Sequence, residues 1–166
     1  MTLVTHAVVG TAVASIFPSH PVIAFLASFA SHFISDAIPH WHYPVRSYSN
    51  DSVDPLNSDL LIGSHFFSDL LRIALDALTG LALSLFVFSQ LGIPVLIIMA
   101  GVIGSILPDP LQFLYWKWRH EPLTSLQRFH IWIHSKKDID HKHFSGILSQ
   151  IAIISIAILF VRISNG

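Results

Sequence analysis

Apolar segments that end at prolines or polar loops make up most of this chain, and they constrain its fold more than any other feature. They span about residues 3–17, 22–38, 60–90, 95–107 and 144–163. Charged residues are only 11% of the chain, against about 25% in ordinary soluble domains. Apolar and polar residues do not alternate with a period of two over any long stretch, so strands are not expected. The sequence therefore predicts one all-α domain, 1–166, an integral membrane bundle of about five apolar helices.

The positions of Lys and Arg predict the orientation of this bundle. If all five segments cross, the N-terminus, loop 40–59 and region 108–143 share one side, and turns 18–21 and 91–94 lie on the other with the C-terminus. Segments 3–17 and 95–107 are short for a bilayer, which needs about 20 residues, so their full crossing is left open. The basic residues in loops of the first side are Arg46, Lys117, Arg119, Arg128, Lys136, Lys137 and Lys142. The positive-inside rule makes that side cytoplasmic.

Two further patterns refine the predicted architecture. The stretch 125–135 places Phe129, Trp132 and Ile133 on one face of an expected helix, which is typical of an amphipathic helix at a membrane interface. The residues around His6 resemble those around Asp76. About thirty residues after each of these positions comes an acidic residue, Asp36 in the first case and Asp109 in the second. The two similarities predict a duplicated helical hairpin over 3–40 and 73–112.

Metal-capable side chains recur at the predicted cytoplasmic end of the segments. His32, Asp36 and His40 follow one another at intervals of four, which stacks them on one helix face. Ionisable groups within apolar segments are costly and suggest function. The other members of the set are His6, His65, Asp69, Asp76, Asp109, His130 and His134. The sequence thus predicts that separate helices bring imidazoles and carboxylates to a common site, whereas the nearby His42 is expected at the membrane interface.

The chemistry of these groups favours a divalent metal. The chain has no cysteine, and imidazole with carboxylate suits zinc, or alternatively manganese or iron, as one or two ions. The predicted metal ligands are His6, Asp36, Asp76, Asp109, His134, His65, Asp69 and His40, and His32 and His130 are predicted to move protons. The alternative for these groups is purely structural: hydrogen-bonded helix ends, a local ion pair with Arg72, or the polar face of an interfacial helix.

Four fragments resemble a family of predicted membrane-bound, metal-dependent hydrolases of bacterial inner membranes. They are Thr5-His6 with Gly10, Ser31-His32-x-x-x-Asp36 followed by Pro39, Leu107-Pro108-Asp109, and His130-x-x-x-His134-Ser135. The resemblance implies a metal site formed by His6, His32, Asp36, Asp109, His130 and His134. In this chain the Ser-His element precedes the Leu-Pro-Asp element, the reverse of the family order, and Leu111 and Gln112 replace an Asp and a His. The chain also resembles uncharacterised small bacterial membrane proteins.

Three functions remain open at this point. The first is a metal-dependent hydrolase at the cytoplasmic face of the inner membrane, acting on a phosphate or ester of a lipid. The second is a proton- or ion-coupled transporter or channel that uses intramembrane Asp residues. The third is a non-catalytic membrane interaction protein. The net charge of −1 provides no broad basic field, so no nucleic-acid partner is expected.

Overall fold

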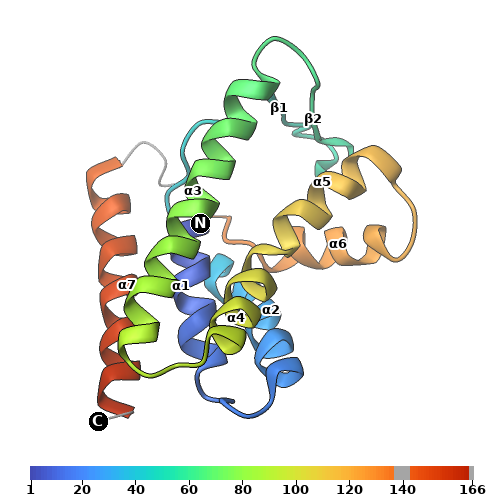
Figure 1. Cartoon of the computed structure of the whole chain (residues 1–166). Helices are drawn as coiled ribbons and strands as arrows, with labels where there is room; N and C mark the ends of the chain where they lie inside the picture. The colour runs from blue at the N-terminus through green and yellow to red at the C-terminus, as the bar shows by residue number, and fades with distance from the viewer. Residues whose placement is uncertain (137–142, 165–166) are drawn as a thin grey trace.

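The computed structural model describes residues 1–136 and 143–164 and is largely helical (Figure 1). Lys137 and Lys142, used above to predict orientation, lie outside the described residues. A small antiparallel pair of strands joins Tyr48 to Leu60. The elements are α1 (Leu3–Ala14), α2 (Pro21–Asp36), β1 (Tyr48–Ser49), η1 (Pro55–Asn57), β2 (Asp59–Leu60), α3 (Phe66–Gln90), α4 (Val95–Ile106), α5 (Pro108–Trp118), α6 (Leu123–Ile133) and α7 (His143–Ser164).

Within residues 1–136 and 143–164, three helical stretches are long and apolar enough to cross a membrane. They are α3, the consecutive helices α4 and α5 taken together over Val95–Trp118, and α7. This finding is compatible with a membrane protein and confirms the predicted helical class. The helices α1 and α2 have only 12 and 16 residues, so five complete crossings and the duplicated hairpin stay predictions.

The fourth apolar segment was predicted to end before Pro108, and α4 does end at Ile106, but the chain does not leave helical structure there. Pro108 is instead the first residue of α5, which follows α4 directly. A proline is tolerated there because the first helical turn does not need its missing N–H. Helical hydrogen bonding continues across the boundary, where Leu111 N donates to the Leu107 carbonyl oxygen at 3.1 Å.

The short helix α1 lies at the centre of the bundle and packs against α2, α3, α4 and α7. Glycines permit the closest approaches. A Cβ atom at Gly101 of α4 would lie 2.6 Å from Cα of Thr11 in α1, and one at Gly104 would lie 2.6 Å from the Phe25 carbonyl oxygen in α2. Small residues at helix contacts are typical of membrane bundles. The core around α1 is formed by Ala7, Val8, Phe88, Ile97, Ile98 and Val102, among others.

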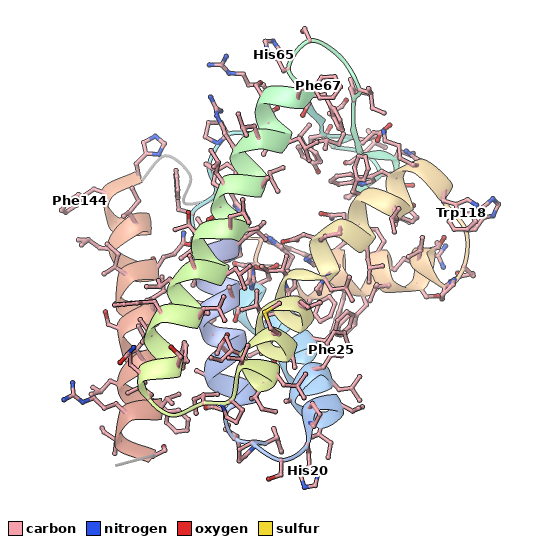
Figure 2. The ribbon with its side chains drawn as sticks, in the orientation of Figure 1. His20, Phe25, His65, Phe67, Trp118 and Phe144 are labelled. Carbon is pink, nitrogen blue, oxygen red and sulfur yellow. The ribbon has the colours of Figure 1, made fainter. Side chains whose placement is uncertain are left out.

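The outer helices expose apolar side chains. Phe86 of α3 and Ile156 of α7 are 71% and 67% exposed, and the labelled Phe67 and Phe144 project outward in Figure 2. An apolar exterior of this extent exceeds what monomeric soluble proteins usually show. It suits a lipid environment.

The two turns and the C-terminus that the sequence analysis placed on one side lie at one end of the bundle. The α1–α2 turn, the α3–α4 turn and the C-terminal end of α7 lie together at the bottom of Figure 1, and the β1–β2 hairpin lies at the opposite end. The helix α6 runs crosswise to α3 and α7. Its Trp132 is 72% exposed, in agreement with the amphipathic helix predicted over this region.

Candidate metal centre

The centre of the site is Asp36, the last residue of α2. Its side chain is buried, and both carboxylate oxygens are surrounded by nitrogens. Oδ1 lies 3.2 Å from His6 Nε2, 3.4 Å from His40 Nε2 and 3.1 Å from the Met1 nitrogen. Oδ2 lies 3.2 Å from both His32 Nε2 and His130 Nε2. Residues from α1, α2, α6 and the loop after α2 therefore converge on one carboxylate.

His6 is brought to this carboxylate by α1. The imidazole is 1% exposed, its Nδ1 has no hydrogen-bond partner among the described residues, and its Nε2 faces only Asp36 Oδ1, at 3.2 Å. It stacks on the ring of His32, with centroids 4.1 Å apart and planes 19° apart. A buried polar group without a partner is costly. The ring is thus available as a ligand for a metal ion.

His32 has a ring nitrogen placed where it could bind a proton or a metal ion. Its Nδ1 donates a hydrogen bond to the Ser105 carbonyl oxygen at 2.8 Å. Because a carbonyl only accepts, a neutral His32 carries its proton on Nδ1 and has a lone pair on Nε2. That Nε2 lies 3.2 Å from Asp36 Oδ2 and 3.7 Å from Asp109 Oδ1. The lone pair on His32 Nε2 and the two carboxylates repel one another unless a second proton or a metal ion lies between the nitrogen and the carboxylate oxygens.

The spacing of the donor atoms fits a metal. With zinc–ligand bonds of about 2.0–2.1 Å, neighbouring ligands of a tetrahedral ion are separated by about 3.3 Å, close to the distances around Asp36. Two overlapping groups have suitable geometry: His6 with His32 and Asp36, and His32 with Asp109 and His130. The hydrogen bond from His32 Nδ1 to Ser105 orients the ring, as is usual for metal-binding histidines. These groups can hold a metal ion.

The structure brings together six residues of the predicted site, namely His6, His32, Asp36, His40, Asp109 and His130. His134 lies next to this group, where its ring faces those of His40 and His42. The predicted ligands His65, Asp69 and Asp76 belong to none of the metal-capable groups found among residues 1–136 and 143–164.

Asp69 and His65 have local surroundings instead. Asp69 is buried and accepts hydrogen bonds from the backbone N and Oγ of Ser47 at 2.7 and 2.8 Å. Its other oxygen lies 3.9 Å from Arg72 Nη1, which is the local ion pair considered as an alternative above. His65 is exposed at the start of α3, at the top of Figure 2. These contacts attach the β1 loop to α3.

Asp76 caps the N-terminus of α1. One carboxylate oxygen accepts from Leu3 N at 2.7 Å and the other from Val4 N at 3.2 Å. The first N–H groups of a helix have no partner within the helix, and a negative charge there also complements the helix dipole. The prediction of Asp76 as a ligand rested on its position within an apolar run, and this contact accounts for a carboxylate there without a metal.

His42 is the metal-capable residue that the sequence analysis assigned to the interface rather than to a site. Its Nε2 lies 2.8 Å from Nε2 of His40. The available signal was the spacing of two residues between them, because alternate side chains of an extended segment point to the same side. Burial lowers the pKa of His40 to about 4 and that of His42 to about 2, and it also lowers the pKa of His134. All three rings are therefore neutral at pH 7.

Comparison of the chain with protein-family models, curated proteins and solved structures gave no match. The fold and the site together define a helical protein with three helices able to cross a membrane and with buried His/Asp groups able to hold a metal ion.

Proposed function

We propose that this chain is a membrane-embedded, metal-dependent hydrolase whose active site is the group around Asp36. The observation that carries this proposal is the arrangement of His32, whose Nε2 lone pair faces two carboxylates while its Nδ1 donates to Ser105. Of the two species that can lie between these atoms, a second proton or a metal ion, we propose the metal ion, and zinc suits a set of imidazole and carboxylate ligands.

We assign His6, His32 and Asp36 to metal binding, and Asp109 and His130 to proton transfer. This assignment places His32 among the ligands, because its fixed tautomer directs Nε2 to the carboxylates. When bound, a divalent metal acidifies water and polarises a phosphoryl or carbonyl oxygen. Hydrolysis of an ester or phosphate needs such activation.

Two residues have positions suited to handling the substrate and its protons. The side chain of Asp109 is 35% exposed, whereas that of Asp36 is 3% exposed, so Asp109 is the carboxylate that an entering substrate meets. His130 is buried at the end of α6, and its Nε2 bonds Asp36 Oδ2 at 3.2 Å. In our proposal Asp109 accepts a proton from the attacking water, and His130 donates a proton to the leaving group.

The position of the site along the bundle supports a substrate at the membrane surface. The charged residues of α3 end at Asp76, and Asp76 contacts the first turn of α1, which also carries His6. The site therefore lies where the apolar part of the bundle begins. The nearby α6 exposes Phe129 and Trp132, side chains typical of a membrane interface. We infer a lipid phosphate or lipid ester as substrate, on the cytoplasmic face indicated by the basic loops.

This proposal is tested by hydrolysis assays on the purified protein in detergent. The substrates are p-nitrophenyl phosphate, a p-nitrophenyl acyl ester and phosphatidic acid, each with and without a chelator. We expect zinc-dependent hydrolysis of at least one, with a loss of about 100-fold or more in Asp36→Asn. Glu121→Gln changes an exposed carboxylate and is the matched control. Hydrolysis that is unchanged by the chelator and by Asp36→Asn, or absent for all three, contradicts the proposal.

A further inference from the structure

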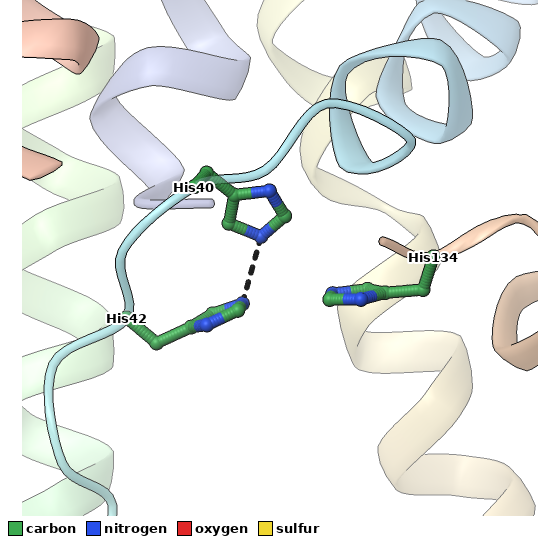
Figure 3. A group of neighbouring side chains, drawn as sticks. All are labelled: His40, His42 and His134. Atoms are coloured by element: carbon green, nitrogen blue, oxygen red, sulfur yellow. Dashed lines mark hydrogen bonds between the residues drawn. The ribbon is translucent and has the colours of Figure 1, made fainter. Parts of the chain in front are cut away.

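Three imidazoles form a second cluster beside the Asp36 group. His40 and His42 lie in the loop after α2, and His134 follows the last residue of α6. Figure 3 shows the three rings pointing toward one another. The rings of His42 and His134 are stacked, with centroids 5.4 Å apart and planes 18° apart. One nitrogen from each of the three rings lies within 4.8 Å of the others.

Backbone carbonyls fix the tautomers of two of these rings. His40 Nδ1 donates to the Ile38 carbonyl oxygen at 2.7 Å, and His134 Nδ1 donates to the Ser135 carbonyl oxygen at 3.1 Å. In the neutral rings Nε2 then carries a lone pair. Such a hydrogen bond from the second nitrogen is the usual support of a metal-binding histidine. It leaves His40 and His134 in the form that binds metal.

The third ring completes the arrangement. Because the proton of His40 is on Nδ1, the 2.8 Å contact between the two Nε2 atoms needs a proton on His42 Nε2. A metal ion can take the place of this shared proton. Zinc ligands are about 3.3 Å apart in a tetrahedral site, so His42 has to move by about half an ångström. His42 lies in a loop between α2 and β1, so this movement does not require a helix to shift.

The cluster is held together independently of any ion. Ser135 N donates to the Asp36 carbonyl oxygen at 2.8 Å, which attaches the end of α6 to the end of α2. This bond keeps His134 next to the His40 loop. The Nε2 of His40 also lies 3.4 Å from Asp36 Oδ1. The cluster is thus preorganised and directly adjoins the first site.

We propose that His40, His42 and His134 form a second metal site, which takes a divalent ion of the zinc class. Three neutral imidazoles are a sufficient protein ligand set for tetrahedral zinc, with the fourth position open to water or substrate. The site lacks the carboxylates of the Asp36 group and so has a different ligand chemistry. This inference does not rest on the hydrolase proposal, because it concerns binding by other residues.

The test is a metal titration of the full chain in detergent after removal of bound metal by a chelator. Cobalt(II) is the probe, since a tetrahedral nitrogen site gives a visible absorption band, and zinc competition then measures affinity. We expect the wild type to bind one ion at this cluster in addition to that at Asp36. His42→Ala and His134→Ala should each weaken the second ion by about 100-fold or more, because loss of even a supporting outer residue costs 10–100-fold. His20→Ala, at an exposed histidine, is the control.

The variants separate this inference from the proposed function. If Asp36→Asn loses one ion and His42→Ala loses the other, both proposals stand. If His42→Ala and His134→Ala retain the wild-type stoichiometry and zinc affinity within about twofold, the second site is refuted, whatever the result for Asp36→Asn. Loss of all bound metal in His42→Ala also refutes a separate site. Circular dichroism of each variant establishes that the helices are intact, and His42→Asn repeats the test with a smaller change if His42→Ala is unfolded.

Discussion

Asp76 provides a sharp test, because the structure gives it a different role from the one that its position in the sequence suggests. Asp76→Asn keeps the size of the side chain but removes its charge and one of its two acceptor oxygens. In the structure these oxygens accept from Leu3 N at 2.7 Å and Val4 N at 3.2 Å. The amide can satisfy only one of these donors.

The expected cost follows from these two contacts. A hydrogen bond to a charged group contributes about 1.5–3 kcal/mol, and a carboxylate at a helix N-terminus adds about 0.3–1 kcal/mol. Losing one such bond and the charge should therefore lower the free energy of unfolding by about 2–4 kcal/mol. For a chain of this length, this corresponds to a decrease in Tm of about 5–15 °C. Metal stoichiometry should stay at the wild-type value.

The assay is thermal unfolding in detergent, followed by circular dichroism, with metal content measured on the same samples. Thr79→Ala is the control, since Thr79 is exposed one turn further along α3 and its hydroxyl bonds only the Leu75 carbonyl of the same helix. Loss of metal from Asp76→Asn without a change in Tm would refute the capping role. That result would make Asp76 a candidate metal ligand again.

Three further predictions follow from particular contacts. Gly101→Ala should lower the free energy of unfolding by about 1–3 kcal/mol in chemical denaturation, because the added methyl group meets the α1 backbone; unchanged stability would contradict the close α1–α4 packing. Gln150→Leu should cost about 2–4 kcal/mol in the same assay, since it leaves Thr2 N and the Thr5 hydroxyl without their acceptor; wild-type stability would contradict this attachment of α7 to α1. His130→Gln should reduce the hydrolytic rate by about 100-fold or more in a steady-state assay, and a wild-type rate would exclude proton transfer by His130.

Part of the site could be predicted from sequence because helical spacing determines it. His32 and Asp36 are separated by four residues on one helix, so any helix there places them on the same face. The i, i+4 pair of His130 and His134 followed the same rule. Only His130 reaches Asp36, since α6 ends at Ile133 and His134 continues in an extended conformation toward His40.

The roles of the carboxylates could not be predicted, because they depend on contacts between distant segments. Asp36 and Asp76 both lie within apolar runs, yet the first is surrounded by imidazoles and the second by the N–H groups of a helix that begins 73 residues earlier. A single sequence does not show which of its distant segments are in contact. His42 was placed at the interface for a similar reason, since its partner His134 is supplied by α6.

The fold was predictable to the level of its class. Hydropathy indicated apolar helices, and three stretches have the length and composition for a membrane. The predicted end of the fourth segment lies within one residue of the end of α4, but the helix that begins at Pro108 was not predicted, because a proline that stops one helix can equally begin the next. The small β1–β2 pair within the polar loop has too few residues to leave a pattern in the sequence.

The central claim, that the buried group around Asp36 holds a divalent cation, is tested most directly by elemental analysis of the gently purified protein. The account predicts at least one zinc-class ion per chain in the wild type and in Glu121→Gln, and the loss of that ion in Asp36→Asn. A folded wild-type protein that carries no metal, and binds none when zinc is added, would contradict it.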